Sequence, residues 1–278
     1  IVALPPAKQP HGFLQLCAAF LMHVIQFLPA VLVAIVSPDL MDTRTALCFK
    51  DGDVCAPTKE LRKAAPVSLE KLKTASKARN ATINDILLLA TTGALRRYLL
   101  HVKDPSLMSG KSLRLRAIMV MSLRPPTMPV AVANKLTFIL IPMPVQTSDI
   151  AGRLKKIQAS VKFVKTSLLP TITTFLFDVL FKLAGQAAMQ HKIQSVQRNQ
   201  TLSFSSIKGP DGEVTLCGAK VKSISYWVNP AQMPLLVSAI SYNGSVNCQA
   251  TIDAGVIKDP DALVRCINEE FTAILEVL

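Results

Sequence analysis

The sequence predicts an α/β fold in which helices and strands bury one sizeable core. Three observations support this prediction. An apolar run begins at Ile86 just after a helix start, residues 113–122 and 135–144 have the length and composition of strands, and an Asn-Gly pair at 243–244 separates two more strand-like runs. The chain has 278 residues, of which 50% are hydrophobic, so a folded core is expected rather than disorder.

The central helix is predicted to start at Thr82. Thr82 and Asp85 have the spacing of a capping box, in which the hydroxyl accepts from an early amide and the carboxylate accepts from the amide of the cap. The apolar run that follows predicts a buried helix to about residue 100. The other predicted helix caps are Ser68, Ser148 and Asp259.

The second half of the chain is predicted to hold two more helices and several strands. Residues 171–189 read as an apolar helix that is broken or kinked near Gly185. Residues 201–206 are predicted as a short strand, and residues 214–228 as one or two more. The Asn-Gly pair predicts a hairpin of residues 235–253, and residues 260–278 carry the apolar stripe of a last helix.

The stretch from Gly12 to Val36 contains no Asp, Glu, Lys or Arg. A membrane-spanning helix needs ~20 apolar residues, so three interpretations remain: a transmembrane helix, a helix lying on a bilayer, or a helix packed on another domain. Because the first residue is Ile1, we expect a fragment or a processed chain. The predicted organisation is a membrane-associated apolar segment over residues 1–37, a linker over 38–65 and a lobe over 66–278.

The charge of the chain is strongly positive and unevenly placed. The net charge is +13, and residues 86–177 hold 13 Lys and Arg against two acids. Such a basic face suits anionic lipid head groups, the phosphates of coenzyme A or nucleic acid, although it also fits ordinary solvated surface. Nucleic acid is the weakest candidate, because the aromatic content is only 5% and no nucleic-acid-binding motif is present.

Several kinds of site are excluded because their sequence motifs are missing. The six cysteines are scattered without a C-x-x-C pair, and the four histidines lack metal-ligand spacing, so neither a zinc site nor a disulfide framework is expected. The sequence has no G-x-S-x-G, and the Gly-Lys-Ser at 110–112 lacks the earlier glycine of a phosphate-binding loop.

An ordered set of short blocks resembles the C-terminal half of the wax ester synthase/diacylglycerol acyltransferase (WS/DGAT) family. The first block is TINDILLLA at 82–90, followed by GALRRYL at 93–99. Residues 120–125, VMSLRP, are similar to the "P-V-S-L-R" strand end of the family. Residues 133–144 look like its "G-N" strand, and residues 205–210, SSIKGP, like its "S-N-V-P-G-P" block.

The resemblance implies one lobe of a fold like that of the coenzyme A-dependent, chloramphenicol acetyltransferase-like acyltransferases, with a mixed sheet, flanking helices and a channel between two lobes. The implied reaction transfers a fatty acyl group from acyl-CoA, as co-substrate, to diacylglycerol or a long-chain alcohol. No tightly bound cofactor and no metal are expected. The residues that the resemblance places at the channel are Asn84, Asp85, Ser122, Arg124, Asn134, Ser205 and Gly209.

Two departures from the family pattern bear on activity. The "H-H-x-x-x-D-G" motif, which supplies the catalytic histidine, belongs to an N-terminal half, and no histidine of this chain has that context. In the block at 205–210, Ser206 and Lys208 replace an Asn and a Pro. We therefore expect a lobe that is inactive without an N-terminal catalytic lobe, or else a non-catalytic lipid- or membrane-binding module. The expected location is the cytoplasmic face of the endoplasmic reticulum, the plasma membrane or a lipid droplet.

Overall fold

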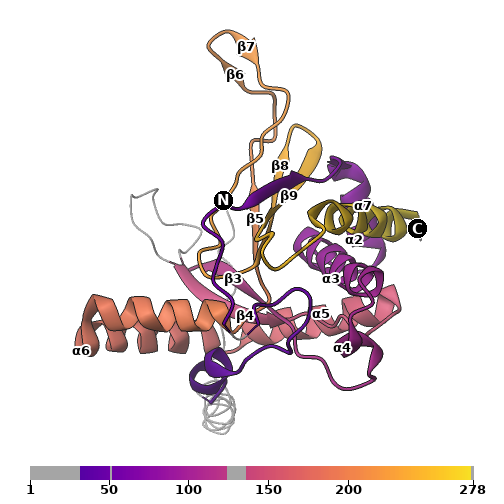
Figure 1. Ribbon diagram of the computed structural model, residues 1–278. Coiled ribbons are helices and arrows are strands. Elements are labelled where there is room, and N and C mark those ends of the chain that lie inside the picture. Colours follow the sequence, from indigo (N-terminus) through magenta and orange to yellow (C-terminus); the bar gives the residue numbers. More distant parts are fainter. Residues whose placement is uncertain (1–31, 51, 124–135, 277–278) are drawn as a thin grey trace, which may run out of the picture.

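The computed structural model describes residues 32–50, 52–123 and 136–276, and a mixed sheet lies at its centre (Figure 1). The strands pair in the order β1-β9-β8-β5-β3-β4, and β2 pairs with β9 as a seventh strand. β5 runs parallel to both β3 and β8, so the mixed sheet is confirmed. The strands are β1 Glu60–Lys63, β2 Val67–Ser68, β3 Arg116–Ser122, β4 Leu136–Pro142, β5 Leu202–Lys208, β8 Leu235–Tyr242 and β9 Ser245–Ile252.

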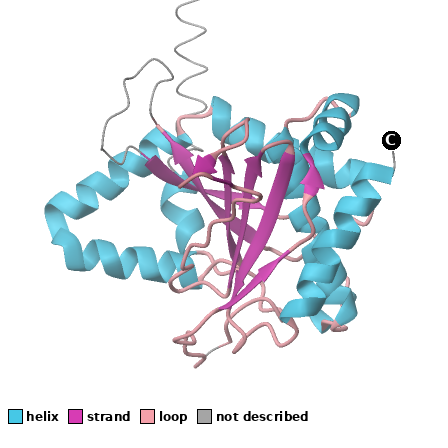
Figure 2. Ribbon diagram, turned by 90° about the horizontal axis from the view of Figure 1, so that it is seen from above, coloured by secondary structure: helices cyan, strands magenta, loops and turns pink. Residues whose placement is uncertain are grey.

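Four helices cover one face of this sheet, and one long helix lies apart from them (Figure 2). The covering helices bury their apolar faces against the inward side chains of β5, β8 and β9. Each fully buried Leu, Ile or Phe contributes roughly 1.5–3 kcal/mol. The helices are α2 Leu69–Ala78, α3 Ile83–His101, α5 Ile150–Thr166 and α7 Pro260–Glu276 on the sheet, the short α4 Pro105–Met108 and 3-10 helix η1 Ser37–Asp39, and the separate α6 Leu169–Arg198.

The helix caps follow the local chemistry, with one correction. Ser68 accepts from the amide of Lys71, and Asp259 accepts from the amide of Ala262, as predicted. The predicted cap at Ser148 is wrong. Asp149 caps α5 instead, accepting from the amide of Gly152 at 2.5 Å, because Asp149 is the residue directly before the first helical turn.

The Asn-Gly turn between β8 and β9 is confirmed. Asn243 and Gly244 have φ values of 42° and 77°, the left-handed pair that a type I′ turn requires. The predicted strands of residues 214–228 are shorter than expected. Only β6 Thr215–Leu216 and β7 Ala219–Lys220 form, as an exposed arm that projects from the top of the molecule in Figure 1.

Several described residues of the segment 38–65, which the sequence predicts as a linker, pack on the lobe. β1 adds to the edge of the sheet beside β9, and Leu47 and Phe49 are buried. Of the apolar segment predicted over residues 1–37, residues 1–31 lie outside the described part of the chain. Residues 32–36 are helical, and Ala34 packs against Leu169 and Ile172 of α6.

Helix α6 is a bent pair of helices. Gly185 has φ 78° and ψ −177°, values that no residue inside a helix adopts, and the chain turns back on itself there (Figures 1 and 2). The predicted break near Gly185 is confirmed, and the second arm extends to Arg198. By length and composition, α6 is also the one described helix that could cross a membrane, although only 11% of its most apolar window is buried.

Candidate functional site

The sheet face opposite α3 and α7 carries two chemically different halves. Side chains alternate along a strand, and the register aligns Ser205 with Ser238 and Ser238 with Gln249. This β8–β9 half is polar. On the β3–β4 half, Ile118 aligns with Leu140 and Val120 with Phe138, so that half is apolar.

The polar half holds down the segment that follows the β6–β7 arm. Asn247 donates its side-chain amide to the carbonyl of Ile224 at 3.0 Å, while Gln249 and Ser238 both donate to the carbonyl of Tyr226. These side chains are buried, so the bonds satisfy backbone carbonyls that would otherwise lose water without compensation. The polar row therefore fixes the course of residues 224–226 across the sheet.

Tyr226 links this segment to Ser205, one of the residues expected at the channel. The hydroxyl of Tyr226 donates to the hydroxyl of Ser205 at 2.9 Å. Burial raises the pKa of Tyr226, and the hydrogen bond to Ser205 offsets part of that rise. Tyr226 therefore stays protonated near neutral pH and acts as a hydrogen-bond donor.

The apolar half opens into a cavity of about 200 Å³. The sheet supplies its floor, the two arms of α6 supply one wall, and residues 33–38 and 228–233 complete the rim. Most of the lining is aliphatic or aromatic, and Ser203 is one of the few polar residues on the floor. Such a cavity binds an apolar chain and not a charged group. Lining residues include Val120, Phe138, Leu140, Phe177, Ile193 and Leu236.

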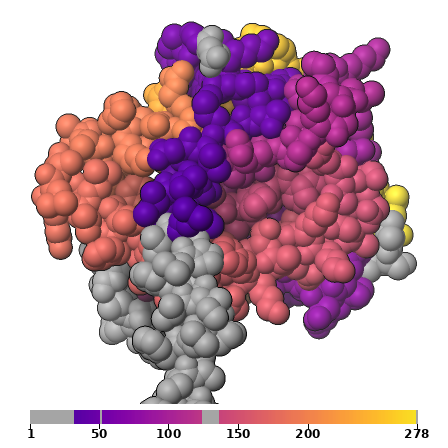
Figure 3. All heavy atoms as spheres, turned by 90° about the horizontal axis from the view of Figure 1, so that it is seen from below, coloured from indigo at the N-terminus to yellow at the C-terminus, as the bar shows by residue number. Residues whose placement is uncertain are grey.

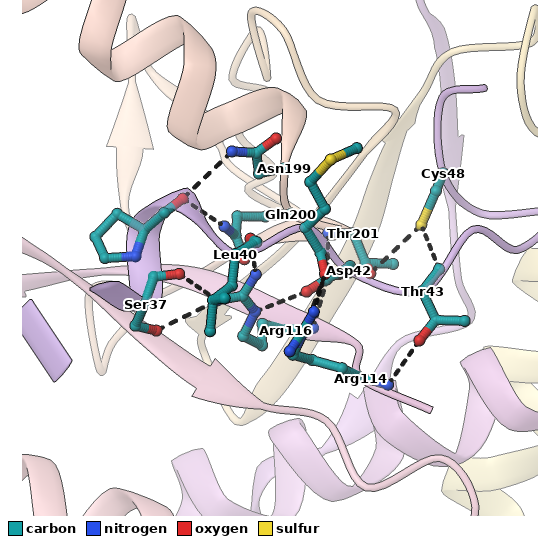
Figure 4. A network of polar contacts seen from close by, with 12 residues as sticks. Ser37, Leu40, Asp42, Thr43, Cys48, Arg114, Arg116, Asn199, Gln200 and Thr201 are labelled. Carbon is teal, nitrogen blue, oxygen red and sulfur yellow. Dashed lines mark hydrogen bonds and ion pairs between the residues drawn. The ribbon is translucent and has the colours of Figure 1, made fainter. Parts of the chain in front are cut away.

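A buried ionic network anchors one rim of the cavity (Figure 4). Asp42 accepts from the backbone and the side chain of Arg116 and also from the amide and hydroxyl of Thr201. The guanidinium of Arg116 donates in turn to the carbonyls of Ser37 and Leu40. The side chains of Asp42 and Arg116 are only 2% and 5% exposed. Because Ser37 itself lines the cavity, this network sets the position of the rim relative to β3 and β5.

Three of the expected channel residues lie in, or directly after, two sheet strands. Ser122 ends β3, Ser205 lies in β5, and Gly209 follows β5 directly. Asn84 and Asp85 instead start α3, on the helix side of the sheet, where Asn84 is exposed and Asp85 is buried. Arg124 and Asn134 lie outside the described residues.

The carboxylate of Asp85 completes a capping box. One of its oxygens accepts from the amide and hydroxyl of Thr82, and the hydroxyl of Thr82 accepts from the amide of Asp85. The capping interpretation is therefore confirmed. The other carboxylate oxygen, Oδ1, is buried and has no hydrogen-bond partner within the described part of the chain.

We expect Asp85→Ala to lower the free energy of unfolding by about 1–2 kcal/mol, because the amide and hydroxyl of Thr82 lose their carboxylate acceptor and the capping box of α3 is broken. Denaturant unfolding measures this change. Asn84→Ala is the matched control, since Asn84 occupies the same turn but is exposed, and it should change stability by less than about 0.5 kcal/mol. Equal effects of the two changes would contradict the capping role.

The close approach of β5 and β8 requires a glycine at position 209. A Cβ at Gly209 would clash with the carbonyl oxygen of Ser241, whereas a Cβ at Gly212 meets open space. We expect Gly209→Ala to destabilise the lobe by about 1–3 kcal/mol, as overpacking does elsewhere. Gly212→Ala is the control and should leave the melting temperature close to that of the parent chain. A shift that is the same for both glycines would rule out the steric explanation.

Several arginines of the basic segment 86–177 bind acceptors inside the lobe. Arg97 and Arg153 both donate to Glu270, which is buried, and Arg96 donates to the carbonyl of Val145. Burial lowers the pKa of Arg153, while the charge of Glu270 opposes that effect. Arginines that the sequence places on a basic face therefore hold helices together. The lysines of α5 stay exposed.

Sequence reasoning did not find the cavity residues. The relevant signal is the alternation in β4, where Leu136, Phe138 and Leu140 are large, apolar and partly exposed, together with the exposed Val120 of β3. No group of three or more His, Cys, Asp or Glu side chains able to hold a metal occurs among the described residues.

A family model described as the WS/DGAT C-terminal domain matches residues 132–275, slightly more than half of the chain. The chain belongs to the WS/DGAT family. Among Arabidopsis thaliana relatives, wax ester synthase/diacylglycerol acyltransferase 11 is 29% identical over an alignment of 259 residues that covers 85% of this chain and 53% of the relative. Number 8 is 28% identical over 265 residues, covering 86% and 54%. This WS/DGAT chain thus spans about half the length of the curated relatives it matches.

Solved structures support the same fold. The wax ester synthase/diacylglycerol acyltransferase from Marinobacter aquaeolei VT8 superposes with a TM-score of 0.59 at 18% identity, covering 94% of this chain and 57% of that one. A condensation-domain structure from the enacyloxin polyketide synthase gives 0.57 at 17% identity, with 98% and 52% covered. The WS/DGAT lobe therefore has the acyltransferase-like fold expected from its sequence.

Proposed function

We propose that this chain is the C-terminal lobe of an O-acyltransferase that moves a fatty acyl group from acyl-CoA to diacylglycerol or a long-chain alcohol, giving triacylglycerol or wax esters. The observation that carries this proposal is the apolar cavity on the open face of the sheet, in a chain of the WS/DGAT family. An alkyl chain is the apolar substrate part that such a cavity holds, at about 0.8 kcal/mol for each methylene buried.

We assign to this lobe the positioning of the substrate and not the transfer of its proton. Of the two histidines in the described part of the chain, His101 lies 3.6 Å from Asp259 and His191 lines a different pocket, so neither lines the cavity. The base that takes the proton from the attacking hydroxyl is therefore proposed to come from a separate N-terminal lobe. The cavity would keep the alkyl chain out of water and hold its carbonyl end at the mouth.

The open sheet face is the surface on which we place that second lobe. Val120, Phe138 and Ile207 are large apolar side chains that stay 40–48% exposed on this face, and the β6–β7 arm projects beyond it. A covering lobe would bury these side chains and close the cavity into a channel. The phosphates of acyl-CoA would then meet exposed lysines, and lipid acceptors would arrive from a membrane or lipid-droplet surface on the cytoplasmic side.

The direct test is acyl transfer by this lobe joined to, or mixed with, a lobe that carries the H-H-x-x-x-D-G motif. Ester formed from long-chain acyl-CoA and diacylglycerol or hexadecanol, and absent with either lobe alone, is the expected result. If the paired lobes form no ester but this lobe still binds vesicles, the chain is a non-catalytic lipid-binding module and the acyltransferase proposal is wrong.

A further inference from the structure

Helices α5 and α6 form a strongly basic surface with an apolar tip. Residues 150–198 hold eight Lys and Arg against a single acid, Asp178, and all of these cations except Arg153, which is buried against Glu270, lie at least partly at the surface. Both helices appear on the face of the molecule seen from below, pink for α5 and orange for α6 (Figure 3). On α5 the exposed lysines Lys162 and Lys165 flank the half-exposed Phe163.

The bend of α6 presents large apolar side chains to solvent. Residues 181–187 are all exposed, with Phe181 at 52% and Leu183 at 83%. Lys182 lies between them. Phe175, one and a half turns before Phe181, is also exposed. Aromatic and Leu anchors interleaved with lysines are typical of helices that lie in the head-group region of a bilayer.

The same helix reaches the cavity. Thr173 and Phe177 from the first arm and Ile193 and Val196 from the second arm line it. The end of the uncharged stretch also lies at the cavity, since Val33 and Ala34 line it beside Leu169. An apolar ligand that enters between these elements passes directly from the surroundings of α6 to the sheet.

We propose that the bent helix α6 is a lipid-surface anchor, which inserts Phe181 and Leu183 into one leaflet while the lysines of α5 and α6 contact anionic head groups. Each arm is shorter than the ~20 residues that a spanning helix needs, and the reversal at Gly185 returns the chain to the lobe. Asp178 and Lys182 keep the insertion shallow, because a charge in the hydrocarbon core is costly. The net positive charge of the region complements phosphatidylserine and not a second copy of itself.

This inference deepens the proposed function, because the anchor would deliver lipid to the cavity of that site. Its test needs no turnover. The full chain is sedimented with phosphatidylcholine vesicles, with and without phosphatidylserine, and compared with the tip variant Phe181→Glu/Leu183→Glu. The matched control is Val54→Glu/Leu216→Glu, which changes two apolar residues that are 85% and 67% exposed but do not belong to the bend of α6.

We expect the tip variant to lower the vesicle partition coefficient by roughly 100-fold, about tenfold for each buried anchor, and the control to stay within about twofold of the parent chain. Lys162→Gln/Lys165→Gln should weaken binding to the phosphatidylserine vesicles and leave binding to pure phosphatidylcholine unchanged. Circular dichroism verifies that each variant is folded. The N-terminal stretch is the same in all variants, so the differences belong to the helices.

Two outcomes would overturn the anchor. One is a tip variant that binds vesicles as tightly as the parent chain. The other is a tip variant that changes the sedimentation mass without vesicles, which would make the bend an interface between copies of the chain. The proposed function can fail independently of the anchor. Vesicle binding that depends on Phe181 and Leu183, in a lobe that supports no ester formation, would leave the anchor and remove the acyltransferase.

Discussion

Asp42→Ala should lower the free energy of unfolding by about 3–5 kcal/mol, the cost of leaving one partner of a buried ion pair alone. Asp42 receives hydrogen bonds from the backbone and side chain of Arg116 and from Thr201, at distances of 2.5–2.9 Å. Without the carboxylate, the guanidinium of Arg116 remains buried among carbonyl groups, and two backbone amides lose their acceptor. Urea unfolding followed by circular dichroism measures the loss.

An exposed ion pair provides the control. Lys208 and Asp211 lie 2.8 Å apart, but their side chains are 74% and 72% exposed. Water and salt screen such a pair, so Asp211→Ala should cost less than about 1 kcal/mol. The large effect at Asp42 is also expected to move the cavity rim, because Arg116 holds the carbonyls of Ser37 and Leu40. A cost at Asp42 no greater than that at Asp211 would show that the network does not stabilise the lobe.

Val120→Trp is expected to change chain-length preference in the two-lobe enzyme. Val120 lines the cavity and is 47% exposed, so an indole can replace it without a large change in the core. If the indole excludes about four methylenes of the acyl chain, the loss is ~3 kcal/mol, or roughly 100-fold in kcat/KM for long-chain acyl-CoA. Short-chain acyl-CoA should be used about as well as before.

Val54→Trp is the matched control for this experiment, because Val54 is exposed and does not line the cavity. It should leave both kinetic constants unchanged for every chain length. If Val120→Trp reduces long-chain and short-chain turnover equally, the cavity does not hold the acyl chain. If it reduces neither, the alkyl group binds elsewhere in the protein.

Features set by a few neighbouring residues were predictable from the sequence. The capping box at Thr82 and Asp85, the Asn-Gly turn and the break at Gly185 all depend on interactions within one turn of chain, so their residues alone specify them. The wrong prediction of Ser148 as the cap of α5 also concerns interactions within one turn. Two adjacent residues could both cap α5, and the sequence does not show which one precedes the first helical turn.

The order of family-like blocks also allowed the acyltransferase-like lobe to be expected before its sheet was seen. The candidate site was harder to predict from the sequence. Ser122 ends β3, Ser205 lies in the middle of β5 and Gly209 follows β5, but Asn84 and Asp85 lie on the helix side of the sheet. Short motifs indicate which family a chain resembles, and they do not state which face of a sheet a residue occupies.

The cavity, the buried arginines and the exposed bend of α6 were decided by tertiary structure. The cavity joins residues as distant in sequence as Val33, Val120 and Leu236, and Arg116 finds Asp42 across 74 positions. Charge counts do not separate Arg97 and Arg153 from surface cations, because only the packing of α3 against both α5 and α7 brings Glu270 to the two arginines. Local propensities act over a few residues, whereas burial and ion pairing depend on which distant segments the folded chain brings together.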